Sequence, residues 1–184
     1  MFVPEISSPP VSLPGKPKGA NWAEPAKFID DVYYRADGSG YSQKGFNQLF
    51  TLNANGGNAQ QLTDDNFDYN GGVSFSKNGE SLYFSANRHA EHALKPTNSE
   101  VYQLNLSTLE ITPLTDRNGP DQQPQVSPNG QYLAYTGYDD KRTNYEDTQL
   151  YIRDLKTGDT QSLTSDFDRS VGQIQWSANS KGLY

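Results

Sequence analysis

The side chains able to carry out chemistry are few, and they lie in polar, turn-rich segments. His89 and His92 are the only histidines, and their spacing would allow metal ligation on a helix. Their segment is polar and offers no obvious third ligand, so we expect solvated loop residues. Ser39 lies in Asp37-Gly-Ser-Gly40, which lacks the Gly-x-Ser-x-Gly spacing of a hydrolase nucleophile elbow. We therefore expect Ser39 to be a turn residue and the chain to hold no catalytic residue.

The segment that begins at Asp64 partly matches a calcium-binding loop. Asp64, Asn66 and Asp68 supply oxygen atoms at the first, third and fifth positions. The sixth position is Tyr69 where a calcium loop has glycine, and the twelfth is Phe75 where it has glutamate. The sequence also has no cysteine, which excludes disulfides and thiolate chemistry. We expect no metal and no cofactor.

An internal repeat sets the elements that must position these residues. Val73–Phe84 reads as two short apolar strands joined at Asn78-Gly79, the signal for a two-residue hairpin turn. Similar blocks follow at 125–135 and 175–184, and Leu82, Leu133 and Leu183 align at spacings of 51 and 50 residues. A strand repeat of this period indicates a propeller or a similar array.

Two further strands complete each repeat. The third strand is predicted at Leu49–Leu52, Val101–Leu104 and Leu150–Arg153. The fourth strand ends at a Leu-Thr pair, at 62–63, 114–115 and 163–164. Val32–Arg35 aligns with Leu82–Ser85 and is expected to be the second strand of an earlier repeat.

We therefore predict an all-β fold, a partial β-propeller of about three and a half four-stranded antiparallel blades. Residues 1–21 are rich in proline and are expected to form an extended tether. The partial propeller is expected over 22–184, with blade boundaries near 22–72, 73–123, 124–172 and 173–184. Because the third Ser-x-Asn block reaches only Tyr184, we expect the chain to be a fragment of a longer propeller. Unpaired blade edges would then favour self-association through edge strands.

Composition narrows the classes of partner. The 184 residues carry a net charge of −7, whereas nucleic acids and anionic membranes reward a basic face. We expect neither nucleic acid nor a membrane as a partner. Long polar segments, which include 87–100 and 137–148, all connect strands at the same end of the predicted blades, where binding residues usually lie.

Several sequence segments resemble the propeller of the prolyl oligopeptidase family of serine peptidases, most closely its acylaminoacyl-peptidase and dipeptidyl-peptidase-like branch. They are Tyr34–Tyr41, Phe50–Leu52, Leu62–Asp64, Ser85–His89, Thr136–Asp140 and the Ser-Pro-Asn-Gly block at 127–130. In that family a propeller covers an α/β-hydrolase domain that follows it in the chain. The resemblance implies a non-catalytic segment that gates access and helps to position short peptides, with the peptidase domain of the same parent chain as its partner. It also favours a periplasmic or secreted location.

Within this resemblance, three residues are candidates for substrate binding. Glu146 and Asp147 would bind the α-ammonium group of a peptide if they face the peptidase cleft, although they also fit solvated loop charges. Arg35 closes a strand before an Asp-Gly turn and would contact substrate or pair with a nearby carboxylate. The Ser-Pro-Asn-Gly block also occurs in TolB-like propellers, so a stand-alone interaction module is the alternative.

Overall fold

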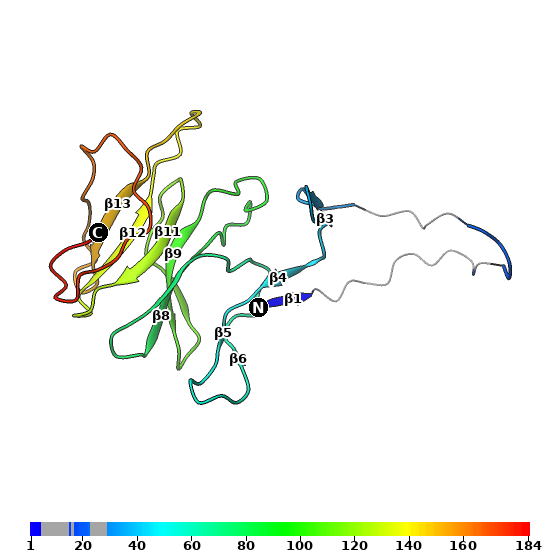
Figure 1. Cartoon of the computed structure of the whole chain (residues 1–184), viewed down its shortest axis with the longest axis horizontal. Helices are drawn as coiled ribbons and strands as arrows, with labels where there is room; N and C mark the ends of the chain where they lie inside the picture. The colour runs from blue at the N-terminus through cyan, green and yellow to red at the C-terminus, as the bar shows by residue number, and fades with distance from the viewer. Residues whose placement is uncertain (5–14, 16, 23–28) are drawn as a thin grey trace.

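The computed structural model describes residues 1–4, 15, 17–22 and 29–184, and these residues form strands and turns. Two four-stranded sheets make up its larger part (Figure 1). The first contains β7 (Val73–Phe75), β8 (Ser81–Ala86), β9 (Glu100–Asn105) and β10 (Ile111–Pro113). The second contains β11 (Asp121–Val126), β12 (Tyr132–Gly137), β13 (Gln149–Asp154) and β14 (Thr160–Ser162).

Each of these sheets is an antiparallel meander in which consecutive strands are neighbours. The strand orders are β10-β9-β8-β7 and β11-β12-β13-β14. The third repeat begins in the same way, with a bridge between Trp176 and Leu183. The predicted all-β class and the four-stranded antiparallel blade are therefore confirmed.

The turn between the first and second strands is longer than the predicted two-residue hairpin. Ser76 and Ser81 close it, because the N–H of Ser76 donates to the carbonyl of Ser81 at 2.8 Å, which leaves four residues in the loop. The Ser76 hydroxyl donates to Asn78 Oδ1 at 2.7 Å and accepts the Ser81 N–H at 3.0 Å. Gly79 then adopts φ 72°, a conformation that glycine enters without steric cost. The same serine-asparagine bonds recur at 127–132 and 177–182.

Three apolar clusters lie between successive repeats. The first joins β8 and β9 to the segment before them, and includes Leu62, Tyr69, Phe84 and Leu104. The second lies between the two large sheets and includes Tyr83 and Leu133. The third covers the far face of the second sheet with Ile174 and Trp176. Each sheet therefore buries both faces against its sequence neighbours, as stacked propeller blades do.

The predicted Leu-Thr pairs fasten the fourth strand to the third. Thr63, Thr115 and Thr164 each accept a third-strand backbone N–H, from Leu49, Val101 and Leu150, at 2.9, 2.9 and 2.8 Å. Each hydroxyl also donates to the side chain just before that N–H, at Gln48, Glu100 and Gln149. We call this repeated arrangement the threonine clasp.

The first repeat differs from the prediction. Its third and fourth strands are present as β5 (Phe50–Thr51) and β6 (Gln60–Gln61), which pair with each other. Upstream, β4 (Gly45–Asn47) pairs with β1 (Phe2–Pro4), although β1 lies within the segment expected to be a tether.

Val32–Arg35 does not form the expected second strand beside β5. Instead, β2 (Arg35–Ala36) pairs with β3 (Gly40–Tyr41) in a small hairpin. The hairpin is local, since Gly38 and Gly40 take φ 84° and 78° and let the chain reverse within four residues. The prediction that Val32–Arg35 forms the second strand of the first repeat is therefore wrong. Most of the expected tether, 5–14 and 16, lies outside the described residues.

The described part of the chain contains no helix of the length and apolarity that would cross a membrane.

Candidate functional site

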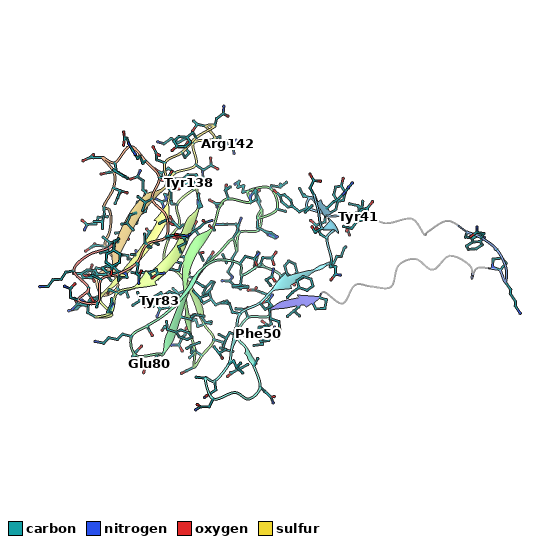
Figure 2. All side chains as sticks on the ribbon, viewed as in Figure 1. Tyr41, Phe50, Glu80, Tyr83, Tyr138 and Arg142 are labelled. Atoms are coloured by element: carbon teal, nitrogen blue, oxygen red, sulfur yellow. The ribbon has the colours of Figure 1, made fainter. Side chains whose placement is uncertain are left out.

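The long connections gather at one end of the two large sheets, which we call the loop face. They comprise 64–72, 87–99, 114–120, 138–148 and 165–172, whereas short turns close the opposite end. Figure 2 shows Tyr138 and Arg142 at the loop face and Glu80 at the turn end. This is the end that the sequence predicted for binding, because loops held by a rigid scaffold usually carry function.

Arg88 forms the first polar network of the loop face. Its Nη2 donates to Asp65 Oδ2 at 2.8 Å, and the Tyr69 hydroxyl donates to Asp65 Oδ1 at 2.8 Å. The guanidinium lies 5.3 Å from the ring centre of Tyr102, a cation–π distance. Burial raises the pKa of Tyr69, so this hydroxyl stays a donor at neutral pH. The network fastens the 87–99 loop to the preceding blade connection.

Arg117 forms the second network. It pairs with Asp121, which is only 1% exposed, and its Nε lies 3.5 Å from Asp139 Oδ1. Its guanidinium lies 4.0 Å from the ring centre of Tyr151. Gly137 leaves the space for this pair, because a Cβ there would overlap Arg117 and Asp121. Both arginines of the loop face networks are therefore committed to internal contacts.

Glu100 forms the third network and is 2% exposed. It accepts the Thr115 hydroxyl at 2.6 Å through Oε2, and its Oε1 lies 3.3 Å from His89 Nε2. Burial raises the pKa of this carboxyl. Glu100 is the threonine clasp residue of the first large sheet, where the flanking repeats have Gln48 and Gln149. A titratable group therefore replaces a neutral one in this repeat alone among the three.

The structure separates the three residues that the sequence nominated for substrate binding. Arg35 lies in β2, where it pairs with Tyr41, and Figure 2 places Tyr41 far from the loop that carries Arg142. Glu146 and Asp147 both lie in that 138–148 loop and are half-buried. Arg35 therefore does not join the two carboxylates in one site.

Glu146 and Asp147 shape their own loop. Glu146 Oε1 accepts the Thr143 hydroxyl at 2.6 Å, and Asp147 Oδ1 accepts the Tyr145 hydroxyl at 2.9 Å. Carboxylates held in this way are oriented in advance, which favours binding of a cation by either residue.

The other chemistry-bearing residues have internal partners. His92 Nδ1 lies 3.1 Å from the His89 carbonyl oxygen, and its ring meets Phe67 edge-on at 5.3 Å. Asp68 Oδ1 accepts the backbone and side-chain N–H groups of Asn47. Among the described residues, no three histidine or acidic side chains gather as metal ligands would.

Two open clefts lie at the loop face. The larger has a volume of about 570 Å³ and lies between the 87–99 loop and β4, with Lys44, Asp68 and His92 in its walls. The smaller has a volume of about 360 Å³ and is lined by Ser85, Asn87, Gln122 and Gln123. Gln123 sits at a shift in the β11–β12 register and has φ 54°. Register shifts of this kind within a strand often re-aim side chains next to binding sites.

Sequence reasoning missed the residues that build these networks. Arg88, Arg117 and the Gln122–Gln123 shift lie in segments without periodicity. Arg88 reaches Asp65 of the preceding repeat, and Arg117 reaches Tyr151 of the following one. The sequence does carry a signal at Glu100. The aligned third strands have glutamine at this position in the other two repeats, Gln48 and Gln149.

Comparison with known protein families gives a match to more than half of the chain. The family described as the dipeptidyl peptidase IV (DPP IV) N-terminal region matches residues 23–145.

Two dipeptidyl-peptidases and a solved structure are similar to the chain. Dipeptidyl-peptidase 5 of Porphyromonas gingivalis is 30% identical over 115 residues, which cover 60% of this chain and 16% of that protein. Dipeptidyl-peptidase 5 of Schizosaccharomyces pombe is 24% identical over 107 residues, which cover 58% of this chain and 16% of that protein. The chain thus spans about one sixth of the length of these relatives. The crystal structure of TolB from Acinetobacter baumannii is similar with a TM-score of 0.59 and 26% identity, over 74% of this chain and 31% of that one.

Proposed function

The chain belongs to the family of dipeptidyl peptidase IV N-terminal regions, and on this premise we propose that it gates and positions short peptides for a serine peptidase. The parent enzyme would be a serine exopeptidase or oligopeptidase, and its α/β-hydrolase active site would lie outside these 184 residues. The family match over 23–145 is the observation that carries this proposal. Similarity to two dipeptidyl-peptidases supports it.

The blades supply a rigid frame for such a gate. We propose blade boundaries near 73–123 and 124–172, where each four-stranded sheet buries both faces. The arginine networks and the buried Glu100 hold the loops between strands in fixed positions. Access for a substrate would then depend on the size of the opening and not on chemistry by this chain. The partner of the chain would be the peptidase domain of the parent protein.

Glu146 and Asp147 are the residues we propose for the α-ammonium group of the peptide. They are adjacent, half-buried and held in place by Thr143 and Tyr145. A carboxylate that is already oriented gains more from a cation than one that must first be ordered. Arg35 remains a separate proposal for substrate contact, because it lies away from this pair.

The test uses the full product of the gene that encodes this chain, assayed with fluorogenic dipeptide amides. Glu146→Gln and Asp147→Asn remove the charge but keep the shape, so we expect each to raise KM at least ~10-fold with a smaller change in kcat, since a charged hydrogen bond contributes about 1.5–3 kcal/mol. Asp168→Asn is the matched control, because Asp168 is 90% exposed in a neighbouring loop, and should leave KM unchanged. Equal KM values for all three variants would remove Glu146 and Asp147 from the substrate site.

A stand-alone interaction module is the second candidate. The similarity to TolB favours it, since the fold alone does not require a peptidase partner. The full gene product separates the two. A protein without peptidase activity that binds a partner protein through this chain would support the module and contradict the gate.

A further inference from the structure

Asparagine followed by glycine occurs five times in the chain. The amide of this dipeptide is chemically labile, because glycine has no side chain to hinder attack of its backbone nitrogen on the asparagine Cγ atom. The five sites share this local sequence, so large differences in their reactivity would have to come from the fold. They are Asn55-Gly56, Asn70-Gly71, Asn78-Gly79, Asn118-Gly119 and Asn129-Gly130.

Four of these five glycines have a backbone N–H that is held by a hydrogen bond. The N–H of Gly119 donates to Asn98 Oδ1 at 2.8 Å. Three others donate to the carbonyl oxygen of the residue three positions earlier, at 2.8 to 3.0 Å, and they are Gly56, Gly79 and Gly130. A nitrogen bonded in this way has to leave its acceptor before it can turn toward the asparagine Cγ.

Three of the asparagine side chains are held as well. Asn78 Oδ1 accepts the Ser76 hydroxyl at 2.7 Å, and Asn78 Nδ2 donates to Glu80 Oε2 at 2.6 Å. Asn129 has the equivalent two bonds in the next repeat. Asn118 Nδ2 donates to a backbone carbonyl oxygen at 3.1 Å. In these three residues the Cγ atom approaches the glycine nitrogen only if such bonds break.

Asn70-Gly71 has neither restraint. Within the part of the chain that the structure describes, the Asn70 side chain and the Gly71 N–H have no hydrogen-bond partner. Both residues are exposed, so water reaches them. The Asn55 side chain also has no partner among the described residues, but the N–H of Gly56 is bonded. Asn70 is therefore the site at which the fold protects the amide least.

Packing explains why glycine is kept at position 71. A Cβ added to Gly71 would overlap both the hydroxyl and the carbonyl oxygen of Ser85 on β8. Only glycine lets the 64–72 segment lie this close to the blade. The labile dipeptide is thus a consequence of a close contact between a loop and a strand.

We propose that Asn70 is a deamidation site, and that its conversion adds a negative charge to the smaller cleft of the loop face. The Gly71 nitrogen attacks Asn70 Cγ, the Cγ–Nδ2 bond breaks, and ammonia leaves with the proton of the Gly71 N–H. Water then opens the cyclic imide. Opening at Cγ gives aspartate with the original main chain, and opening at the main-chain carbonyl carbon gives isoaspartate. In both cases one water is consumed and one ammonia is released.

The new carboxylate would change the character of this cleft of about 360 Å³. Among the described residues that line it, Asp68 is the only one with a charge. A second negative charge at position 70 would favour cationic ligands over anionic ones. This modification stands whether the parent protein is a peptidase or an interaction module.

Peptide mapping by mass spectrometry tests the proposal in the full gene product. The folded protein is incubated in mildly alkaline water labelled with heavy oxygen, so that each newly formed acid carries the label. We expect Asn70 to convert about 5-fold faster than Asn55, whose glycine N–H has to break one hydrogen bond. We expect it to convert at least ~10-fold faster than Asn78 and Asn129, where several bonds have to break.

Unfolding and two variants serve as controls. In urea the five sites keep their sequence but lose their hydrogen bonds, so their rates should converge. Asn70→Gln keeps an amide that forms the cyclic imide much more slowly, and it should remove the first acidic form seen on ion-exchange chromatography. Ser76→Ala removes the hydroxyl that holds Asn78 Oδ1, and it should speed conversion of Asn78 while leaving the rate at Asn70 unchanged.

Three outcomes would overturn the proposal. The first is a folded protein in which Asn70 converts no faster than Asn55. The second is an order of rates that is the same in urea as in the folded protein, which would assign the differences to sequence and not to the fold. The third is an Asn70 that stays intact while the other sites convert.

Discussion

Glu100 shows how one residue alters a repeated design. The threonine clasp needs only an acceptor at this position, and Gln48 and Gln149 supply it without charge. Glu100 supplies it as a carboxyl that is 2% exposed, and burial raises its pKa above the ordinary value of 4.5. A raised pKa means that the folded chain binds the proton more tightly than the unfolded chain.

The raised pKa predicts that the ionised Glu100 carboxylate destabilises the folded chain, and that Glu100→Gln removes this destabilisation. The stabilisation from the proton is complete below pH 4.5 and is lost as the pH rises through the folded pKa. We therefore expect the free energy of unfolding of Glu100→Gln to rise relative to that of the native chain as the pH increases above 4.5. Urea unfolding at several pH values measures the difference.

His89, Thr115 and Asp116 face the Glu100 carboxyl, and the variant leaves them in place. Glu110→Gln, at an exposed position in the turn between β9 and β10, serves as the control and should show no such trend. A Glu100→Gln variant that is less stable than the native chain at pH 7 would contradict this account.

At the scale of elements, the clasp explains why each fourth strand ends in Leu-Thr. Each threonine satisfies a third-strand N–H that the fourth strand does not reach. A buried N–H without a partner costs about 1–3 kcal/mol, so the motif joins two strands at their least regular point.

Threonine-to-valine changes keep the shape and test the clasp. Thr164→Val leaves the Leu150 N–H and the half-buried Gln149 side chain without their hydrogen-bond partner. We therefore expect it to destabilise the fold by about 1 kcal/mol. Thr115→Val also removes the hydroxyl that donates to the buried Glu100, and it should destabilise the fold by about 2–3 kcal/mol. Chemical denaturation gives both values. Equal and negligible losses would show that the clasp does not hold the strands.

The repeat predicted these elements well because it samples each strand three times. The strands around Leu82, Val101 and Leu133 lie where the alignment placed them. It failed at Val32–Arg35, where a local turn at Gly38 competes with a distant partner strand. The two-residue turn was also wrong, since Ser76 and Asn78 build a longer loop by side-chain bonds that periodicity does not encode.

At the scale of the whole molecule, the sequence predicted the end of the sheets where loops gather but not the contacts there. Glu146 and Asp147 share a loop, so their proximity follows from sequence. Arg88 and Arg117 find partners across blades, and such contacts depend on how sheets stack. The connection of the blades to dipeptidyl peptidases comes from the family match and not from these contacts.

The most direct test of the central claim is mass spectrometry of short unblocked peptides incubated with the full product of the gene that encodes this chain. We expect these peptides to be cleaved, and we expect acetylation of the amino terminus, which removes the α-ammonium group, to slow the cleavage. Peptides that stay intact, with a product that is folded and soluble, would contradict the claim that these blades serve a peptidase.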